Sequence, residues 1–428
     1  MAHFEHAAVC SPLTLASEIG ESVLLDGGNA VDAAIVTNLV LAVAYPHMNG
    51  VGGDLLAQVY ADGKLVGLNS SGALPAAAEL PPGGVPERGI GAATVPGAPA
   101  GWAALAERFG TRSLAHLAEP AANIARDGVE RSPGLAKVTE FYRWLLEQNE
   151  DANRIYLADK LLQPELADTL QSLDVFYEGP VAKNAPAPFA PDDFAAHRAE
   201  WVEPTSAPFA GVEVYEMPPN SRGHLALEAI RVMEPLDGLT PDDAEWHLRQ
   251  IRAIRKAAYG GDTIYLCVVD ANGMAVSLNQ SLYMGFGSGV VVPGTGVLLH
   301  NRGAYHTTES YRGSAKPVHT LSPAMAMKDG KPRLVLGTMG GDAQIQIHLQ
   351  LLSRILVAGQ TVEDAVAAPR WNATADTLLV EEGLPELPDG QLITGMPEQF
   401  GHAHCIEITA DGLNAMADPR SDGVPVGY

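Results

Sequence analysis

The chain has 428 residues and 46% of them are hydrophobic, so it can bury a large core and is not an intrinsically disordered protein. Its 51 Asp and Glu residues outnumber its 27 Lys and Arg residues, and the formal net charge is -24. Such an acidic chain is a poor partner for nucleic acid or an anionic membrane, because phosphate groups are bound by basic faces. Three cysteines without paired spacing exclude a disulfide framework and a zinc ribbon: Cys10, Cys267 and Cys405.

The N-terminal stretch lacks the basic start and the continuous apolar core of a secretory signal. The most apolar stretch, residues 30–46, is interrupted by Asp32 and Asn38 and is too short to span a bilayer. We therefore expect a soluble, cytoplasmic protein without a membrane partner.

Helix-like and strand-like segments alternate in the N-terminal part of the chain. Residues 29–45 are rich in Ala, Val and Leu and end before a proline, which predicts a helix. Residues 50–60 and 64–72 flank an Asp62-Gly63 turn and predict a β-hairpin.

The next part of the sequence has a mostly helical pattern. Residues 99–128 predict helical structure with a break at Gly110, and residues 138–173 are mostly helical as well. Residues 180–193 are dense in Pro and Ala and are the stretch most typical of a linker.

A basic helix precedes a β-rich second half. Residues 242–258 predict a helix in which Arg and Lys recur at helical spacing, and we expect that face to be solvated or ion-paired. The helical pattern ends at residues 259–262, and strand patterns follow over residues 263–270 and 274–281. Farther on, the RLVLGTMGGD strand leads into a helix, and we find no internal repeat.

Several common catalytic and cofactor motifs are absent from the sequence. There is no P-loop, no G-x-G-x-x-G at a strand-to-helix turn, no G-x-S-x-G elbow and no H-E-x-x-H pair. His402 and His404 have no acidic or histidine partner at a useful spacing, so we expect both on the surface. The sequence therefore predicts neither a metal site nor a cofactor.

Thr263 stands where a flexible Gly-Gly-Asp stretch meets the start of a predicted strand. A threonine hydroxyl is a weak nucleophile, and a known remedy is to free the α-amino group of the same residue as the general base. That remedy requires cleavage of the peptide bond between Asp262 and Thr263. A loop that leads into a core hairpin is the structural alternative for the same pattern.

Two further features would complete such a site. The Gly340-Gly341 pair follows a predicted strand, so its backbone N–H groups can point at a developing oxyanion. Ser281 lies on the second arm of the hairpin that Thr263 begins, so it can sit across from it. An ordinary strand-to-helix turn and a solvent-facing strand hydroxyl are the respective alternatives.

A series of longer motifs runs in order through nearly the whole chain. It comprises GGNAVDAAI, PHMNGVGGDLLAQVY, VPGAPAGWAALAERFGT, VYEMPPNSRGH, DTIYLCVVDANGMAVSLNQS, LSPAMAMKDGKPRLVLGTMGGD and ADPRSDGVPVGY. These motifs resemble those of the γ-glutamyltransferase (glutathione hydrolase) family of N-terminal-nucleophile hydrolases. The resemblance implies an enzyme without a cofactor and an α/β (α+β) fold, the four-layered αββα sandwich of that class.

By position, the resemblance also implies the catalytic residues. The chain would cleave itself between Asp262 and Thr263, and Thr263 would be the new N-terminus and the nucleophile. Ser281 takes the place of the hydroxyl that activates the nucleophile. Gly340 and Gly341 take the place of the pair whose amides hold the oxyanion.

The same resemblance implies two fragments in one globular domain. Residues 1–262 would be the large-subunit part of the precursor and residues 263–428 the catalytic small-subunit part. The mature protein would be a heterodimer of these intertwined fragments, with further dimerisation left open.

The positions that bind the zwitterionic glutamyl group in the family are changed in this sequence. A clamp arginine, an asparagine, an acidic pair, a serine pair and a further serine are replaced, in chain order, by Ser71, Tyr283, Ala304-Tyr305, His319-Thr320 and Asp342. The elements for acyl transfer remain, while the contacts to a glutamyl head group do not.

The predicted substrate-binding set is Arg302, His319, Thr320, Tyr283 and Asp342. An arginine suits a bidentate grip on a carboxylate, and a site with an arginine and no acid should accept a carboxylate that lacks an adjacent ammonium. The runs DTIYL, HNRGA, HTLSPAM and GTMGGDAQ resemble the oxamate amidohydrolase branch of the family. We therefore expect an amidohydrolase or acyltransferase that acts on a small acidic amide.

Three alternatives stay open at this point. The chain is a true γ-glutamyl transpeptidase or glutathione hydrolase with a rearranged clamp, or it is an unprocessed, inactive scaffold homologue. Arg302 and His319 can also be structural, paired with Asp342 or with each other. The helical region before Thr263 is short for the family, which favours a more open pocket or failed maturation.

Overall fold

The computed structural model describes residues 2–257, 264–341, 343–394 and 397–428, and within them two seven-stranded sheets lie at the centre of the molecule. All strand pairs of both sheets are antiparallel. The first sheet has the order β1 (Ala2–Phe4), β18 (Gly412–Ala417), β17 (Ala403–Thr409), β13 (Lys331–Thr338), β12 (Ala324–Lys328), β9 (Val212–Glu216), β8 (Thr205–Phe209). The second has the order β19 (Val426–Gly427), β2 (Ala8–Cys10), β10 (Ile264–Val269), β11 (Ala275–Ser281), β3 (Asp54–Ala61), β4 (Lys64–Ser70), β7 (Glu200–Val202).

The two sheets pack face to face, and the side chains of β10 show why. Tyr265 and Cys267 lie in the core between the sheets, where they join residues such as Val335 of β13. Leu266 and Val268 point to the opposite face and join the core under the helices. This is the alternation expected for a strand that is buried on both faces.

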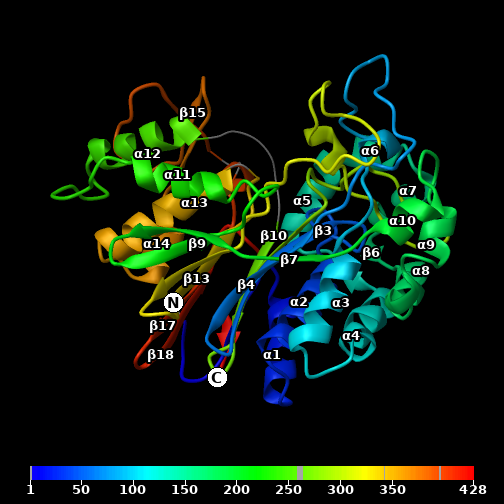
Figure 1. Cartoon of the computed structure of the whole chain (residues 1–428), viewed down its shortest axis with the longest axis horizontal. Coiled ribbons are helices and arrows are strands. Elements are labelled where there is room, and N and C mark those ends of the chain that lie inside the picture. The colour runs from blue at the N-terminus through cyan, green and yellow to red at the C-terminus, as the bar shows by residue number, and fades with distance from the viewer. Residues whose placement is uncertain (1, 258–263, 342, 395–396) are drawn as a thin grey trace.

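Helices cover the outer face of each sheet (Figure 1). The second sheet is covered by α1 (Thr14–Leu25), α2 (Ala30–Ala44), α3 (Ala98–Phe109) and α4 (Leu114–Asp127). The first is covered by α11 (His224–Val232), α12 (Ala244–Ala257), α13 (Ala343–Leu352) and α14 (Val362–Ala367). The result is the four-layered αββα sandwich that the resemblance implied.

The sequence features of α2 explain both its start and its burial. The Asn29 side chain accepts hydrogen bonds from the N–H groups of Val31 and Asp32, and Asp32 accepts one from the N–H of Asn29, which is a capping box. Every residue of the helix is buried, as its almost wholly apolar composition demands. The helix predicted over residues 29–45 is confirmed.

Two further predictions from the sequence have opposite outcomes. The hairpin is confirmed, since β3 and β4 pair along their length and Asp62 and Gly63 have φ values of +50° and +76°, as a tight hairpin turn requires. The prediction of a linker over residues 180–193 is wrong. That stretch contains α9 (Pro180–Asn184) and begins α10 (Pro191–Ala196), because a proline suits the first turn of a helix.

The predicted surface position of His402 and His404 is also wrong, since they are 5% and 0% exposed. His404 lies on β17, which is flanked by β13 and β18, and its Nδ1 accepts a hydrogen bond of 3.1 Å from the N–H of Asp418. The basic helix α12, by contrast, has the ion-paired face expected of it. Arg252 lies 2.6 Å from Glu245 along that face.

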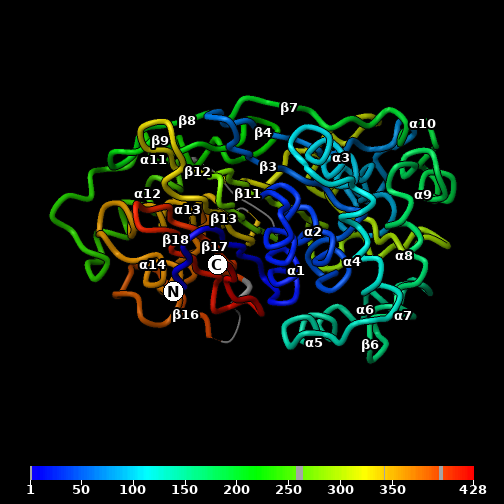
Figure 2. Tube along the Cα trace, turned by 90° about the horizontal axis from the view of Figure 1, so that it is seen from below, coloured from blue at the N-terminus to red at the C-terminus, as the bar shows by residue number. Residues whose placement is uncertain are grey.

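Smaller elements complete the described chain. They are β5 (Val129–Glu130), α5 (Pro133–Phe141), α6 (Arg143–Leu146), α7 (Glu150–Tyr156), β6 (Lys160–Leu161), α8 (Pro164–Leu170), β14 (Trp371–Ala373), β15 (Leu378–Val380) and β16 (Gly390–Leu392). The two chain ends lie side by side below the sheets, where the N–H of His6 donates to the carbonyl of Tyr428 (Figure 2).

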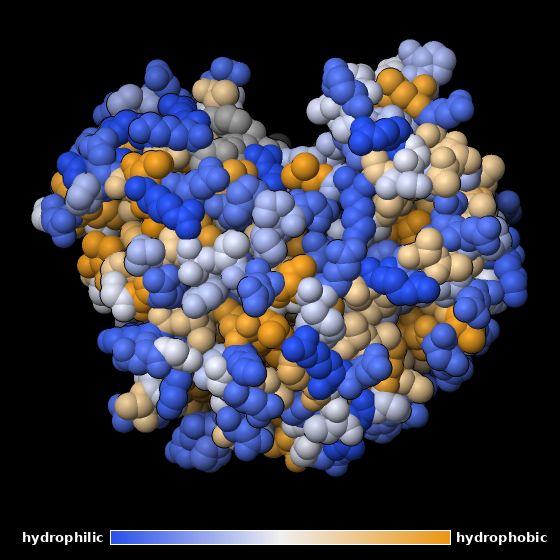
Figure 3. Space-filling view, viewed as in Figure 1, coloured by the Kyte–Doolittle hydropathy of each residue, from blue (hydrophilic) through white to orange (hydrophobic). Residues whose placement is uncertain are grey.

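A deep groove divides the upper part of the molecule in the space-filling view (Figure 3). One wall belongs to the side of α11 and α12, and the other to the side of α5 and α6, as the matching ribbon view shows (Figure 1). The predicted site residues are considered next against this groove.

Candidate active site

The end of β11 and the start of β3 form one corner of the second sheet. Ser281, the last residue of β11, pairs with Asp54, the first residue of β3. The two residues are 1% and 0% exposed. The Ser281 Oγ accepts a hydrogen bond of 2.7 Å from the N–H of Tyr283. Ser281 therefore does not face solvent, which removes the structural alternative for its hydroxyl.

Tyr283 has a strained backbone at this corner, with a φ of +78°. A non-glycine residue in that region costs about 1–3 kcal/mol and persists only where its surroundings hold it. Its ring packs at 5.8 Å from the ring of Tyr305, and the Arg302 guanidinium lies 4.1 Å above it. Such strain is concentrated at functional sites in proteins.

Arg302 is fully buried and joins the predicted substrate-binding residues to one another. Its Nη2 donates a hydrogen bond of 3.1 Å to the hydroxyl of Thr320. Its guanidinium also lies 5.7 Å from the centre of the Tyr305 ring. Since a planar guanidinium stacks well on aromatic faces, the two rings and the hydroxyl fix its orientation.

His319, the residue before Thr320, has an acidic partner that the sequence analysis did not single out. Its Nε2 lies 3.0 Å from Oδ2 of Asp54. The same Oδ2 lies 3.6 Å from Nδ1 of His300, while Oδ1 accepts a hydrogen bond of 3.0 Å from the N–H of Gly72. One buried carboxyl group therefore connects four separate segments of the chain.

The burial of this cluster perturbs its titration. Burial raises the pKa of Asp54 to about 7, although the N–H of Gly72 and the charge of Arg302 act in the opposite direction. Burial lowers the pKa of His300 to about 3, and it holds the pKa of His319 well below the usual value, with help from the charge of Arg302. Both imidazoles are therefore neutral at pH 7.

The Gly340-Gly341 pair lies between the end of β13 and the start of α13. Its φ values of +121° and +57° require glycine, and a Cβ on Gly340 would come within 3.1 Å of Cα of Gly401. In the described chain, neither N–H of the pair makes a hydrogen bond, whereas the two carbonyls accept from Ala343 and Gln344. The two donors are thus available at the N-terminus of a helix, where anions are stabilised.

Two other residues lie around the arginine and its rings. Arg222, at the start of the loop into α11, donates to the hydroxyl of Tyr305. Ser71, at the position of the family's clamp arginine, donates a hydrogen bond of 2.8 Å to Asn69. Asn69 is held in turn by Asn220, at 2.8 Å. Ser71 is therefore part of a fixed hydrogen-bond network.

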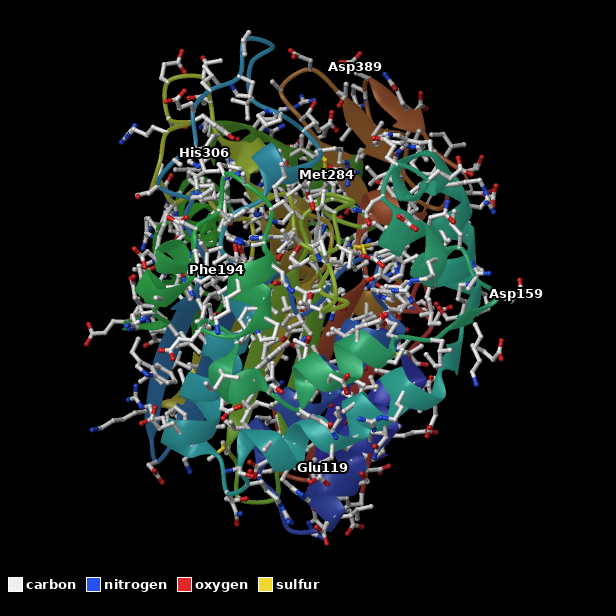
Figure 4. All side chains as sticks on the ribbon, turned by 90° about the vertical axis from the view of Figure 1, so that its right-hand side faces the viewer. Glu119, Asp159, Phe194, Met284, His306 and Asp389 are labelled. Atoms are coloured by element: carbon white, nitrogen blue, oxygen red, sulfur yellow. The ribbon has the colours of Figure 1, made fainter. Side chains whose placement is uncertain are left out.

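The side-chain view labels two residues that follow members of this cluster in the sequence (Figure 4). Met284 and His306, which follow Tyr283 and Tyr305, lie in the upper part of that view, and Glu119 lies at the opposite end. The groove in Figure 3 opens at the same upper end. These sequence neighbours of the predicted site residues therefore lie on the grooved side of the molecule.

Three predicted site residues, Asp262, Thr263 and Asp342, lie outside the described residues. Among the other predicted residues, Tyr283 contacts Ser281 and Arg302, and Arg302 contacts Thr320, the residue after His319, while the roles predicted for these residues stay predictions. Asp54 and His300, which also belong to this cluster, were not predicted from the sequence. A signal for Asp54 exists, since it is a lone acid at the head of an otherwise apolar strand. Asp54 and His319 lie far apart in the sequence, and pattern alone does not pair them.

Within the described ranges, no group of three or more His, Cys, Asp or Glu side chains is placed to hold a metal ion. Over the same part of the chain, every helix is too short or too polar to cross a membrane.

The αββα sandwich is the fold of the N-terminal-nucleophile hydrolases, and comparison with known proteins gives the family. The gamma-glutamyltranspeptidase family model matches residues 16–258 and 241–428. The chain belongs to this family, and it is an enzyme of the N-terminal-nucleophile hydrolase class.

Two relatives and one solved structure are similar over their full length. The chain is 32% identical to the glutathione hydrolase-like YwrD proenzyme of Bacillus subtilis, with 98% of each chain covered. It is 29% identical to the oxamate amidohydrolase proenzyme of Klebsiella pneumoniae, with 99% and 98% covered. It superimposes on the cephalosporin acylase of Bacillus halodurans with a TM-score of 0.93 and 30% identity, over 100% and 96% of the two chains.

The comparison also concerns the short region before residue 263. The match to the Bacillus subtilis relative runs over 517 aligned positions, more than the 428 residues of this chain, so the relative contains residues without a counterpart here. Residues 241–258 are matched by both parts of the family model. Both observations agree with a segment missing near α12.

Proposed function

We propose that the protein is a self-activating amidohydrolase or acyltransferase that cuts a small amide with an anionic acyl group through an acyl-Thr263 intermediate. The catalytic residues in this proposal are Thr263, Ser281, Gly340 and Gly341. Arg302 and Thr320 bind the anionic group, and Tyr283 supports the arginine. His319 fixes the position of Thr320, and Asp342, which lies outside the described residues, is kept as a substrate-binding residue on the sequence prediction alone.

The first step in this proposal is cleavage of the precursor. The Thr263 hydroxyl attacks the carbonyl carbon of Asp262, and the peptide C–N bond breaks, which frees the α-amino group of Thr263 with the proton from the hydroxyl and leaves an ester on the Thr263 oxygen. Water then hydrolyses this ester, which releases the carboxyl group of Asp262 and regenerates the Thr263 hydroxyl. The pairing of β10 with β11 supports this step, because its last described pair is Ile264 with Gln280. Thr263 is bonded to Ile264, and Ser281 follows Gln280, so an activating hydroxyl lies one position further along the partner strand.

The mature reaction uses the same groups on a substrate. The free α-amino group of Thr263 accepts the proton of its own hydroxyl as the oxygen attacks the amide carbon. The N–H groups of Gly340 and Gly341 donate to the oxyanion. The amine leaves with the proton returned by the α-ammonium group, and water or an acceptor amine then takes the acyl group from Thr263.

Cleavage in this proposal would leave both fragments in both sheets. Each sheet contains strands from both residues 1–262 and residues 263–428, and strands of the two parts pair directly in each sheet, so the parts cannot separate without breaking strand pairs. A heterodimer of the two fragments follows from that arrangement, and the relatives named proenzymes support it.

The anionic acyl group follows from the surroundings of Arg302. Its only described acidic neighbour among the predicted site residues and their partners is Asp54, which already accepts from His319 and Gly72. The described site thus offers Arg302 to bind a carboxylate. It has Tyr305 at the position where the ammonium group of a glutamyl substrate would need an acidic residue. The relative named oxamate amidohydrolase supports a short acyl group of this kind, and the structure named cephalosporin acylase supports amide cleavage rather than transfer between peptides.

One observation carries the proposal. Tyr283 donates its N–H to Ser281 at 2.7 Å and presents its ring to Arg302 at 4.1 Å, so the acyl-transfer side and the anion-binding side of the site are joined through one residue. The arrangement suits a substrate that places its amide next to Ser281 and its anionic group next to Arg302.

The test is an amide panel on the purified protein. Oxamate and succinamate are compared with their neutral counterparts oxamide and succinamide, and glutathione is included for the γ-glutamyl alternative. We expect faster hydrolysis of the anionic member of each pair, and a mass increase of one acyl group on the fragment that begins at Thr263 after rapid quenching. Vigorous glutathione hydrolysis, or equal rates within each pair, would contradict the proposal.

A further inference from the structure

Asp54 joins the same two segments that carry the proposed anion-binding pair. His300 and Arg302 lie on one segment, and His319 and Thr320 lie on the other. The carboxyl of Asp54 contacts the two imidazoles, at 3.6 and 3.0 Å, and Arg302 donates to Thr320 at 3.1 Å. The two segments are therefore connected by two sets of contacts, one through the carboxyl group of Asp54 and one through the guanidinium of Arg302.

The proton positions in this cluster follow from its hydrogen bonds. Nδ1 of His319 accepts from the N–H of Leu321 at 3.3 Å, so its proton is on Nε2 and is donated to Asp54. Nε2 of His300 lies 2.8 Å from the hydroxyl of Thr94, which can donate or accept, and 3.0 Å from the carbonyl oxygen of Thr94, which only accepts. A proton on Nε2 suits both oxygens, whereas a lone pair there would face the carbonyl oxygen, so we assign the proton of His300 to Nε2. Nδ1 of a neutral His300 is then a lone pair, and it faces Oδ2 of Asp54.

A lone pair next to a carboxylate oxygen is unfavourable in a buried site. Nδ1 of His300 is buried and has no hydrogen-bond partner in the described chain, and the Asp54 side chain beside it is 0% exposed. A proton on Oδ2 that points toward Nδ1 replaces this repulsion by an attraction across 3.6 Å, while the second lone pair of Oδ2 still accepts from His319. A single proton therefore suits both imidazoles.

We propose that Asp54 is a positioning residue of the anion-binding side: it carries one proton that points toward His300, accepts a hydrogen bond from His319, and thereby holds Arg302 and Thr320 in register. This inference rests on the proposed function, because it assumes that Arg302 and Thr320 bind the carboxylate of the substrate. Asp54 itself is fully buried and acts through these neighbours, not by touching the substrate.

The proton on Asp54 makes substrate binding depend on pH. Burial raises the pKa of Asp54 to about 7, so the proton is present below that pH and is lost above it. Its loss restores the repulsion with His300 and adds a negative charge near Arg302, and both effects weaken the hold on an anionic substrate. The Michaelis constant of the anionic amide should therefore rise as the pH increases from 6 to 8.

The other groups that face Asp54 do not themselves produce this pH dependence of the Michaelis constant. They are His300, His319, Arg302, Lys316 and the more distant Tyr177. Burial lowers the pKa of His300 to about 3 and holds the pKa of His319 far below its usual value, and it raises the pKa of Tyr177, so none of these three titrates between pH 6 and 8. The ratio of the constants for an anionic and a neutral amide cancels the titration of the nucleophile.

The variant test is Asp54→Asn, alone and combined with His319→Gln. An asparagine amide can donate to Nδ1 of His300, but the same nitrogen then opposes the Nε2–H of His319. A glutamine at residue 319 can turn its oxygen toward that nitrogen and remove the conflict. We expect Asp54→Asn to raise the Michaelis constant for the anionic amide about tenfold with kcat within about threefold, and the double variant to recover most of the loss.

Asp32→Asn is the matched control. Asp32 is also a fully buried carboxyl that accepts from backbone N–H groups, at the start of α2, and we expect it to lower stability without changing the Michaelis constant. Constants are measured per active site, on protein whose cleavage is checked by mass. If Asp54→Asn does not fold, the wild-type pH profile alone decides, and a flat ratio from pH 6 to 8 overturns the inference.

The substrate preferences of two variants distinguish a failure of this inference from a failure of the proposed function. If Arg302→Met removes the preference for anionic amides and Asp54→Asn does not alter it, Asp54 has no positioning role and the proposed function stands. If neither variant alters the preference, the anion-binding site itself is wrongly assigned.

Discussion

Replacing Arg302 tests the substrate side of the site. Arg302→Met keeps a long side chain between the rings of Tyr283 and Tyr305 but removes the charge and the hydrogen bond to Thr320. Arg302→Lys keeps the charge and removes the planar group that stacks on Tyr283. The two variants therefore separate charge from geometry at one fully buried position.

The expected size of the effect follows from the contacts that are lost. A hydrogen bond to a charged group contributes about 1.5–3 kcal/mol, and each 1.4 kcal/mol is a factor of about ten. Arg302→Met should therefore lower kcat/KM for oxamate by about ten- to a hundredfold relative to oxamide. Arg302→Lys should lower it by about tenfold or less. The stacking on Tyr283 contributes about 0.5–2 kcal/mol, part of which methionine replaces by sulfur–aromatic contact, so the fold should survive.

The assay measures ammonia release from each amide, together with thermal unfolding of each variant. Arg333→Met is the control, because Arg333 lies at the far end of β13 from Gly340 and pairs with Glu407 at 2.9 Å. It should leave the ratio of oxamate to oxamide rates unchanged. Wild-type selectivity in a folded, cleaved Arg302→Met protein would refute the assignment of Arg302 as the carboxylate-binding residue.

Two further changes test catalysis and stability. The Cβ of Gly340→Ala would lie 3.1 Å from Gly401, so this variant should displace an oxyanion donor and lower kcat by about 10²–10³-fold. The control is Gly330→Ala, in an open turn with a φ of +76°. This control should cost about 1 kcal/mol of stability and leave kcat unchanged. Asp418→Asn should lower the free energy of unfolding by about 3–5 kcal/mol in urea titrations, because the buried Asp418 lies 2.7 Å from Arg370. Burial alone would raise the pKa of Asp418, but the charges of Arg370 and Arg420, with the other contacts of the carboxylate, together outweigh burial and keep the pKa below the usual value. The wild type should therefore lose this contribution only at strongly acidic pH, and a loss near pH 6 would contradict this explanation.

The fold could be predicted because its signals are local. The alternation along β10, the Asp62-Gly63 turn and the Asn29 cap each specify their element within a few residues. The same is true of Gly340, where a strand runs into a helix and only glycine fits the backbone.

The rest of the site could not be predicted because its contacts are between distant segments. Asp54 contacts His319 only when β3, the end of β11 and the loop before β12 come together in the fold. The sequence of each of these segments contains no pattern that indicates the other two. His404 shows the same limit, since it is buried because β13 and β18 flank its strand, and the local sequence does not specify these neighbours. In each case tertiary packing brings a polar side chain to its partner, and the local sequence does not indicate which residue that partner is.

The central claim is that Thr263 frees its own amino group and then acts as the nucleophile. Intact mass under denaturing conditions tests it directly on the wild type and on Thr263→Ala and Thr263→Ser. We predict two fragments for the wild type, the smaller beginning at Thr263, two fragments at a slower rate for the serine variant, and one uncut chain for the alanine variant. A wild-type chain that stays whole, or an alanine variant that is still cut before residue 263, would contradict the account.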